Sequence, residues 1–280
     1  MPQSSRWTGR VALTVTALCL AASPPLAAQT LTIAAAASLH GAYRELAAGF
    51  TDTTGVRTTL VFGASGSLAH QIENGAPYDL FASADTRWVQ TLIDQGHLQP
   101  DSLLYYAEGV LALATRIPGG MAGSTTSPES VPLDAKPLDG WALRKALAPV
   151  MRVIAMAHPG RAPYGTAARE ALQAADLWNS LQARLVFGDN VRQTLTYLET
   201  GNVEAAFVAA SLLVGDGKGI SWRPVSGSLH QPIRQSLGIA TATALLTEAR
   251  RFARFLTSPA GHAILERYGF RIASSSRSIQ

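Results

Sequence analysis

Apolar and polar positions divide residues 58–82 into short blocks that follow one another. Residues 58–62 are β-branched and apolar, which suits a buried strand, and residues 63–67 are only Gly, Ala and Ser. In residues 68–76 the apolar side chains recur at helical spacing, and a proline ends that segment. Residues 78–82 are again typical of a strand. The pattern predicts a strand, a turn, a helix and a second strand.

The preceding residues contain the same unit. Residues 31–37 form an apolar run, residues 39–50 place their apolar side chains on one helical face, and Gly55 ends that helix. Ser38 and Ser65 stand at the two strand-to-helix junctions, where we expect them to act as N-caps. Successive units of this kind predict a parallel sheet, whose ligands bind beyond the carboxyl ends of the strands. Both serines lie there.

The second half of the chain alternates in the same way. Further strands are predicted at residues 110–114, 153–157, 185–187, 203–208 and 233–240, and further helices at residues 86–96, 143–149, 167–177, 191–198, 245–256 and 259–268. Asp85 is in the N-cap position of the first of these helices. Residues 115–140 are rich in Pro, Gly, Ser and Thr, which is typical of a surface loop.

These elements predict an α/β fold of two lobes, each a mixed, mostly parallel sheet flanked by helices, with a ligand cleft between the lobes. We expect the first lobe at residues 29–108, the second at residues 109–222, and a return to the first lobe at residues 223–280, with a flexible, serine-rich tail at residues 271–280. Ser38 and Ser65 are expected on one side of the cleft, and Tyr164 and Val191 on the other.

The N-terminus has the three parts of a secretory signal. Arg6 and Arg10 supply positive charge, residues 11–22 are apolar, and small residues precede an expected cleavage after Ala28. The apolar run is too short to span a membrane. The single cysteine, Cys19, lies inside this segment, so the mature chain is expected to have no thiol, no disulfide and no cysteine metal ligand.

Composition narrows the function classes. The chain has 280 residues, 47% hydrophobic and 15% charged, which is enough to build a folded core. Its formal charge of +4 falls to +2 once the two arginines of the signal are removed. No basic run is interleaved with aromatic residues, so nucleic-acid binding is not expected. The six histidines have no zinc-binding spacing, and we expect neither a resident metal nor a cofactor.

Several segments resemble one known family. They are AAASL at 35–39, FGASGSLA at 62–69, IENGAPYDLFASAD at 72–85, APYG at 162–165, NVR at 190–192 and RYGF at 267–270. They occur in order across the whole mature chain, and the block from 65 to 85 is the most specific. In these segments the chain resembles the molybdate-binding proteins of ABC uptake transporters.

The resemblance implies a type II periplasmic binding fold that closes on molybdate or tungstate, a monomer in the periplasm, and an ABC membrane permease as partner. It implies that Ser38 and Ser65 bind the anion through hydroxyl and backbone donors, and that Tyr164 and Val191 bind it through backbone N–H groups. Some members place a tyrosine hydroxyl on the anion where this chain has Ala209. Further candidate site residues are Ala209 itself, Ser211 and His40.

The donor chemistry is consistent with a fully deprotonated dianion, which accepts hydrogen bonds and donates none. Serine hydroxyls, backbone N–H groups and helix N-termini supply such bonds without a cation. Phosphate at neutral pH keeps a proton and needs an acceptor; Asp189 is the carboxylate close enough to be considered. Another oxyanion such as sulfate remains an alternative, because cavity radius decides between them.

A secreted serine esterase is the alternative from another class. Residues 63–67, GASGS, differ from the G-x-S-x-G nucleophile elbow only at the last glycine. The chain order would permit a triad of Ser65, Asp189 and His230, although nothing in the sequence places His230 near Ser65. We therefore expect a binding protein, not an enzyme.

Overall fold

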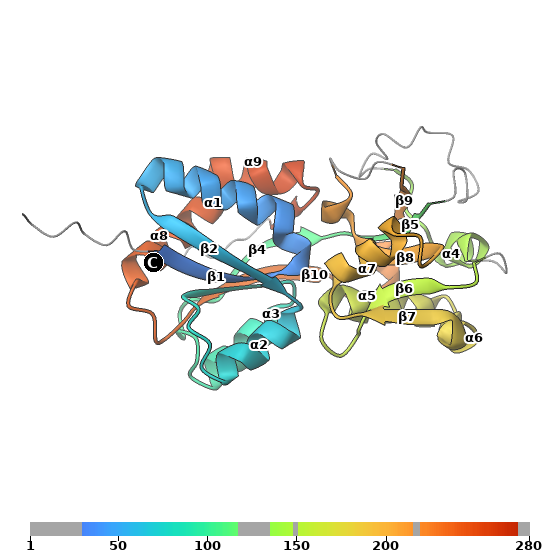
Figure 1. The fold of residues 1–280 in the computed structure, drawn as a ribbon, viewed down its shortest axis with the longest axis horizontal. Coiled ribbons are helices and arrows are strands. Elements are labelled where there is room, and N and C mark those ends of the chain that lie inside the picture. Colours follow the sequence, from blue (N-terminus) through green and yellow to red (C-terminus); the bar gives the residue numbers. More distant parts are fainter. Residues whose placement is uncertain (1–29, 117–134, 148–150, 215–218, 274–280) are drawn as a thin grey trace, which may run out of the picture.

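Two β-sheets, each covered by helices, stand side by side and divide the chain into two lobes (Figure 1). The computed structural model describes residues 30–116, 135–147, 151–214 and 219–273. The expected signal at 1–28 lies outside the described residues, as do most of the 115–140 loop and the chain from 274 onward.

The first lobe contains a six-stranded sheet. Its spatial order is β11 (Arg271–Ile272), β4 (Leu104–Gly109), β10 (Ile233–Ile239), β3 (Leu80–Ser83), β1 (Thr30–Ala36) and β2 (Arg57–Gly63). Strand β1 runs parallel to β2 and β3, whereas β10 runs antiparallel to β3 and β4, and β11 antiparallel to β4. The expectation of a mostly parallel sheet therefore holds only for β1 to β3, because β10 re-enters from the second lobe.

The second lobe contains a five-stranded sheet. Its spatial order is β7 (Leu185–Gly188), β6 (Ile154–Ala157), β8 (Ala205–Ala209), β5 (Leu111–Thr115) and β9 (Ser221–Pro224). Strand β6 is parallel to β7 and β8, and β5 is antiparallel to β8 and β9. Both sheets are thus mixed, as the sequence predicts.

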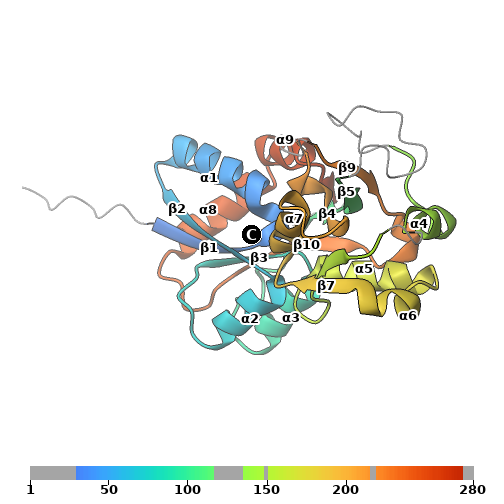
Figure 2. The ribbon, with the colours of Figure 1, turned by 45° about the vertical axis from the view of Figure 1, so that its right-hand side comes forward.

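Helices cover the sheets of both lobes (Figures 1 and 2). The first lobe has α1 (His40–Thr54), α2 (Ser65–Glu73), α3 (Thr86–Asp94), α8 (Leu246–Leu256) and α9 (Pro259–Arg267). The second has α4 (Gly140–Ala146), α5 (Pro163–Ala174), α6 (Trp178–Leu181) and α7 (Val191–Glu199). Short 3₁₀ turns are η1 (Ala37–Leu39), η2 (Gln182–Arg184), η3 (Ala210–Leu212) and η4 (Gly227–Leu229).

Strand β1 shows why the first sheet needs helices on both faces. Its buried side chains belong to two clusters: Leu31 and Ile33 pack with α1, α8 and α9, and Ala34 packs with α2 and α3. Successive side chains of a strand point to opposite faces, so a strand with buried apolar side chains on both faces must be covered on both sides. As expected, Gly55 ends α1 in the left-handed region (φ 74°), and Asp85 caps α3.

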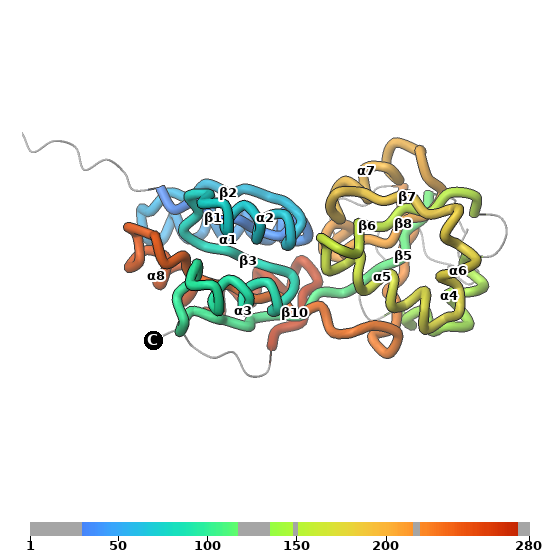
Figure 3. Tube along the Cα trace, turned by 90° about the horizontal axis from the view of Figure 1, so that it is seen from below, coloured from blue at the N-terminus to red at the C-terminus, as the bar shows by residue number. Residues whose placement is uncertain are grey.

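The chain crosses between the lobes twice, and the crossings lie side by side (Figure 3). The first crossing runs from β4 into β5 through Gly109 and Val110, close to the expected boundary. The expected return at residue 223 is wrong by several residues, because Arg223 still pairs with Leu113 in the second sheet. The return falls after Pro224, and β10 begins at Ile233 opposite Gly109.

The expected tail needs a similar correction at its start. Arg271 and Ile272 form β11, which pairs with Glu108 and Ala107 of β4, so the chain is still part of the first sheet there. The remainder of the tail lies beyond the described residues.

Candidate functional site

Direct hydrogen bonds join the lobes at the carboxyl ends of the strands. The Gly66 N–H of α2 donates to the Arg161 carbonyl at 2.9 Å, and the Ser211 hydroxyl of η3 donates to the Ser38 carbonyl at 2.7 Å. A side chain at position 66 would meet that Arg161 carbonyl at 2.9 Å, so glycine permits the close approach. The lobes are therefore in contact around the predicted serines.

Ser65 is completely buried as the first residue of α2, and the expected N-cap role is wrong. Ala64 holds the cap position and no side chain caps the helix. The Ser65 hydroxyl instead accepts a hydrogen bond from the Ala84 N–H at 3.1 Å. Because that bond uses only a lone pair, the hydroxyl proton remains available to donate to a ligand.

Ser38 differs from its expected role in the same way. It lies in the short turn η1, and α1 begins two residues later with Leu39 in the cap position. Its side chain is buried, and its hydroxyl has no hydrogen-bond partner within the described ranges. A buried polar group without a partner is costly, so this hydroxyl is ready to bond a ligand in the cleft.

Tyr164 supplies two donors to the same region. It follows Pro163 at the start of α5, where no side chain caps the helix, so its N–H is one of the free donors of a helix N-terminus. Its hydroxyl is buried, has no hydrogen-bond partner in the described part of the chain, and lies near the Ser38 side chain. Burial raises the pKa of Tyr164, an effect that the Ser38 hydroxyl partly offsets. The phenol therefore stays protonated.

Val191 is the first residue of α7, which packs against η1 of the other lobe. The Asn190 side chain caps this helix by accepting from the N–H groups of Arg192 and Gln193, both at 3.0 Å. The cap leaves the Val191 N–H free for a ligand. Two helix N-termini of the second lobe, α5 and α7, thus present uncapped N–H groups, which favour an anion.

The three further candidates have different roles. Ala209 ends β8, is fully buried and offers no side-chain donor. Ser211 already donates its hydroxyl to the Ser38 carbonyl, so it joins the lobes. The His40 ring packs at a tilt of 49° against the Phe62 ring, with centroids 4.8 Å apart, and lines an outer groove between α1 and β2. Burial lowers the pKa of His40, and the charges of Arg192 and Arg44 lower it further.

The structure does not assemble the triad of the esterase alternative. Asp189 has an exposed side chain that pairs with Arg161 at 3.8 Å, and His230 Nδ1 bonds the Gln231 carbonyl at 2.8 Å. The Ser65 hydroxyl faces the Ala84 N–H. Each of the three groups is engaged elsewhere.

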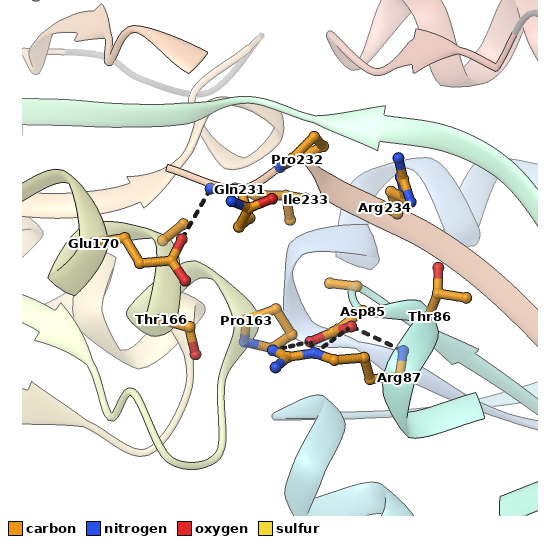
Figure 4. Close-up of a pocket in the computed structure, with 12 residues that line it drawn as sticks. Asp85, Thr86, Arg87, Pro163, Thr166, Glu170, Gln231, Pro232, Ile233 and Arg234 are labelled. Carbon is orange, nitrogen blue, oxygen red and sulfur yellow. Dashed lines mark hydrogen bonds and ion pairs between the residues drawn. The ribbon is translucent and has the colours of Figure 1, made fainter. Parts of the chain in front are cut away.

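A pocket of about 270 Å³ opens between the lobes beside this site (Figure 4). Asp85 and Arg87 line one wall, and Glu170 lines the other, with its carboxylate accepting from the Gln231 N–H at 2.9 Å. The Arg87 guanidinium bonds Asp85 at 2.7 and 2.9 Å, so this cation is already paired. The sequence does not predict the contact of Glu170 with Gln231, which are 61 positions apart, whereas Asp85 and Arg87 are only two positions apart in one lobe.

The described residues contain neither a candidate metal site nor a candidate membrane span. No group of three or more His, Cys, Asp or Glu side chains could hold a metal ion. No described helix combines the length and apolar character needed to cross a lipid bilayer.

Comparison with known proteins places the chain in a family. The family model described as bacterial extracellular solute-binding protein matches residues 31–271. The chain is 33% identical over 263 residues to the molybdate-binding protein ModA of Rhodobacter capsulatus, covering 94% of this chain and 96% of that protein.

Solved structures support the same family assignment. The periplasmic molybdate-binding protein of Azotobacter vinelandii superposes with a TM-score of 0.75 at 28% identity, covering 87% of this chain and 100% of the other. The sulfate-binding protein SubI of Mycobacterium tuberculosis has a TM-score of 0.68 at 14% identity, covering 88% of each chain, and shares the fold alone. The chain belongs to the bacterial extracellular solute-binding proteins and, among them, to the family of the molybdate-binding protein ModA.

Proposed function

We propose that this protein captures molybdate, and tungstate as well, between its two lobes and delivers the anion to an ABC permease. The relatives that carry the name molybdate-binding protein support this function. In our proposal Ser38 and Ser65 bind the anion from the first lobe, and the N–H groups of Tyr164 and Val191 bind it from the second. The lobes close around it.

The observation that carries the proposal is a pair of buried hydroxyls, those of Ser38 and Tyr164, for which the described residues provide no hydrogen-bond partner. The two side chains interact with one another, and the Tyr164 N–H is a free donor at the start of α5. A tetrahedral dianion supplies the acceptors that these donors lack. Each charge-assisted hydrogen bond contributes about 1.5–3 kcal/mol, so several of them hold an anion without a cationic side chain.

The neighbouring arginines support a site of neutral donors. Arg87 is hydrogen-bonded to Asp85, and Arg161 lies 3.8 Å from Asp189. Each guanidinium group thus has a carboxylate beside it. We assign them to the cleft entrance.

Thermal unfolding with molybdate, tungstate, sulfate and phosphate tests the proposal. A ligand at one hundred times its dissociation constant stabilises the folded state by about 2.7 kcal/mol. We expect molybdate and tungstate to raise the unfolding temperature at micromolar concentrations, and sulfate and phosphate to do so only at much higher ones. Stabilisation by sulfate alone would establish the sulfate alternative, and indifference to all four anions would refute an oxyanion carrier.

The biological setting of the proposal follows from the same function. We propose export to the periplasm by a cleaved signal at residues 1–28, action as a monomer, and no enzymatic activity. Mass spectrometry of the exported protein would give the mature N-terminus, expected at residue 29. Turnover of a chromogenic ester that is lost in Ser65→Ala would contradict the carrier role.

A further inference from the structure

Gly109 occupies the point where the chain first crosses between the lobes. It ends β4, directly before the segment that enters β5 of the second lobe, and it pairs with Ile233, the first residue of β10. The two crossing segments therefore meet at this one pair of residues. Gly109 is not among the glycines with positive φ, so its backbone conformation is open to any residue.

The lack of space for a side chain, rather than the backbone conformation, explains why position 109 is a glycine. A Cβ at position 109 would overlap the Tyr164 hydroxyl oxygen and would lie 3.0 Å from both the Tyr164 ring and the Gln235 side-chain nitrogen. Contacts this short are not found around real Cβ atoms without movement of a neighbour. The tyrosine hydroxyl thus fills the place of a side chain at the crossing.

Tyr164 reaches this point from the other lobe. Its backbone belongs to α5, which packs on β5, β6 and β8 of the second lobe and touches β10 of the first. Its ring is buried, and its hydroxyl lies near Ser38 and at Gly109, both in the first lobe. A single side chain therefore spans from the second lobe to the crossing.

Gln235 completes the arrangement on the second crossing. It is fully buried at a bulge of β10, and its side-chain nitrogen donates to the Ile233 carbonyl at 3.0 Å. Its side-chain oxygen, like the Tyr164 and Ser38 hydroxyl oxygens, has no hydrogen-bond partner among residues that the structure describes. The Gln235 side chain and the Tyr164 hydroxyl therefore both border the space that a side chain at position 109 would occupy.

We infer that Tyr164 couples the ligand to the hinge: its N–H faces the cleft while its hydroxyl seats against Gly109, so the closed form requires the absence of a side chain at position 109. The N–H contact rests on the proposed function, whereas the seat against Gly109 does not. Lobe separation moves α5 away from the crossing, and a side chain at position 109 then has room. Substitution of Gly109 therefore penalises closure selectively.

A double-mutant cycle tests this coupling with the full chain exported through its own signal. The variants are Gly109→Ala, Tyr164→Phe and the two combined, and Gly227→Ala is the control, because a Cβ at position 227 meets nothing within 4 Å. Molybdate affinity is measured by isothermal titration calorimetry. Spin labels on Arg57→Cys and Asn179→Cys, exposed positions of the two lobes, report the closed fraction by pulsed electron paramagnetic resonance with and without molybdate.

We expect Gly109→Ala to weaken molybdate binding at least tenfold and to lower the closed fraction, while Gly227→Ala changes neither. In the Tyr164→Phe background the clashing oxygen is gone, so adding Gly109→Ala should weaken molybdate binding less than threefold. The coupling is overturned if Gly109→Ala weakens binding equally in the wild-type and Tyr164→Phe proteins, or if it weakens binding in neither.

Failure of the proposed function can be distinguished from failure of the coupling between Tyr164 and Gly109. If the wild-type chain does not bind molybdate, the proposed function fails, and the closed fraction of the ligand-free proteins still decides the coupling. In that case a lower closed fraction in Gly109→Ala than in wild type, restored by Tyr164→Phe, supports it. Equal closed fractions in these three proteins overturn it.

Discussion

The hydroxyls of Ser38 and Ser65 are both buried near the start of a helix, yet among the described residues only that of Ser65 has a hydrogen-bond partner. Ser65 accepts from the Ala84 N–H, whereas Ser38 bonds no described group. Ser65→Ala leaves a buried N–H unpaired and should lower the free energy of unfolding by about 1–3 kcal/mol. Ser38→Ala should leave it unchanged or raise it slightly.

Both substitutions should weaken molybdate binding about tenfold to hundredfold, the loss of one charge-assisted hydrogen bond of about 1.5–3 kcal/mol. Urea unfolding of the ligand-free proteins and calorimetric titration separate the two effects. Equal stability losses in the two variants would contradict the assigned partners, and wild-type affinity in either variant would remove that serine from the site.

His230 gives the fold a dependence on pH. Its Nε2 is buried without a partner in the described structure, and burial lowers its pKa, an effect opposed by the Gln231 carbonyl and the Glu170 charge. The unfolded chain therefore binds a proton more readily than the folded chain below the ordinary value of 6.5. The free energy of unfolding should fall as the pH drops through 6.5 and level off below the folded pKa.

Urea unfolding between pH 7.5 and 5 measures this slope, and His230→Asn should flatten it. An unchanged slope in that variant would assign the effect to other groups.

The N-termini of α5 and α7 in the second lobe differ in how their free N–H groups are accounted for. At α7 the Asn190 side chain occupies the N–H groups of Arg192 and Gln193, and at α5 Pro163 removes one donor. Aspartate caps a helix as well as asparagine does, but it adds a charge. At about 5 Å and an effective dielectric constant of about 20, two unit charges interact by about 3 kcal/mol.

Asn190→Asp should therefore keep the stability of the ligand-free protein and weaken molybdate binding at least tenfold. Asn190→Ala is the matched control: it loses about 1 kcal/mol of stability with the cap, but it introduces no charge. Thermal unfolding and calorimetry compare the three proteins. Affinity in Asn190→Asp equal to that of the wild type would place the anion away from α7.

Local signals predicted the elements, but not the partners of their polar groups. Gly55 and Asp85 behave as the sequence indicates, because a C-terminal glycine and an N-cap aspartate act within four residues. Ser38 and Ser65 have the same local signature as caps, and tertiary contacts decide otherwise. The residue type at a helix start identifies a possible hydrogen-bonding group, and only the fold shows which partner it bonds.

At the scale of the whole molecule, the sequence predicted the two lobes and their mixed sheets. It misplaced the return crossing, since the apolar and polar pattern of β9 does not reveal which sheet the strand joins. The approach of Tyr164 to Gly109 links residues 55 positions apart and has no local signal. Contacts between lobes depend on the closed arrangement, which periodicity along the chain does not encode.

Closure also determines how fast the ligand leaves. The Ser211 hydroxyl donates to the Ser38 carbonyl across the lobes at 2.7 Å, a bond that forms only when the lobes meet. Ser211→Ala should speed molybdate release about two- to tenfold, the equivalent of one hydrogen bond of about 0.5–1.5 kcal/mol. Association should be unchanged, because the ligand enters the open form before this bond exists.

Stopped-flow tryptophan fluorescence with molybdate measures both rates. The control is Ser226→Ala, which removes local hydrogen bonds to the N–H and the hydroxyl of Ser228. A slower association rate with normal release would mean that Ser211 acts in the open form. The predicted asymmetry follows from geometry: a contact between the lobes stabilises the closed, ligand-bound form, and it is absent from the open form that captures the ligand.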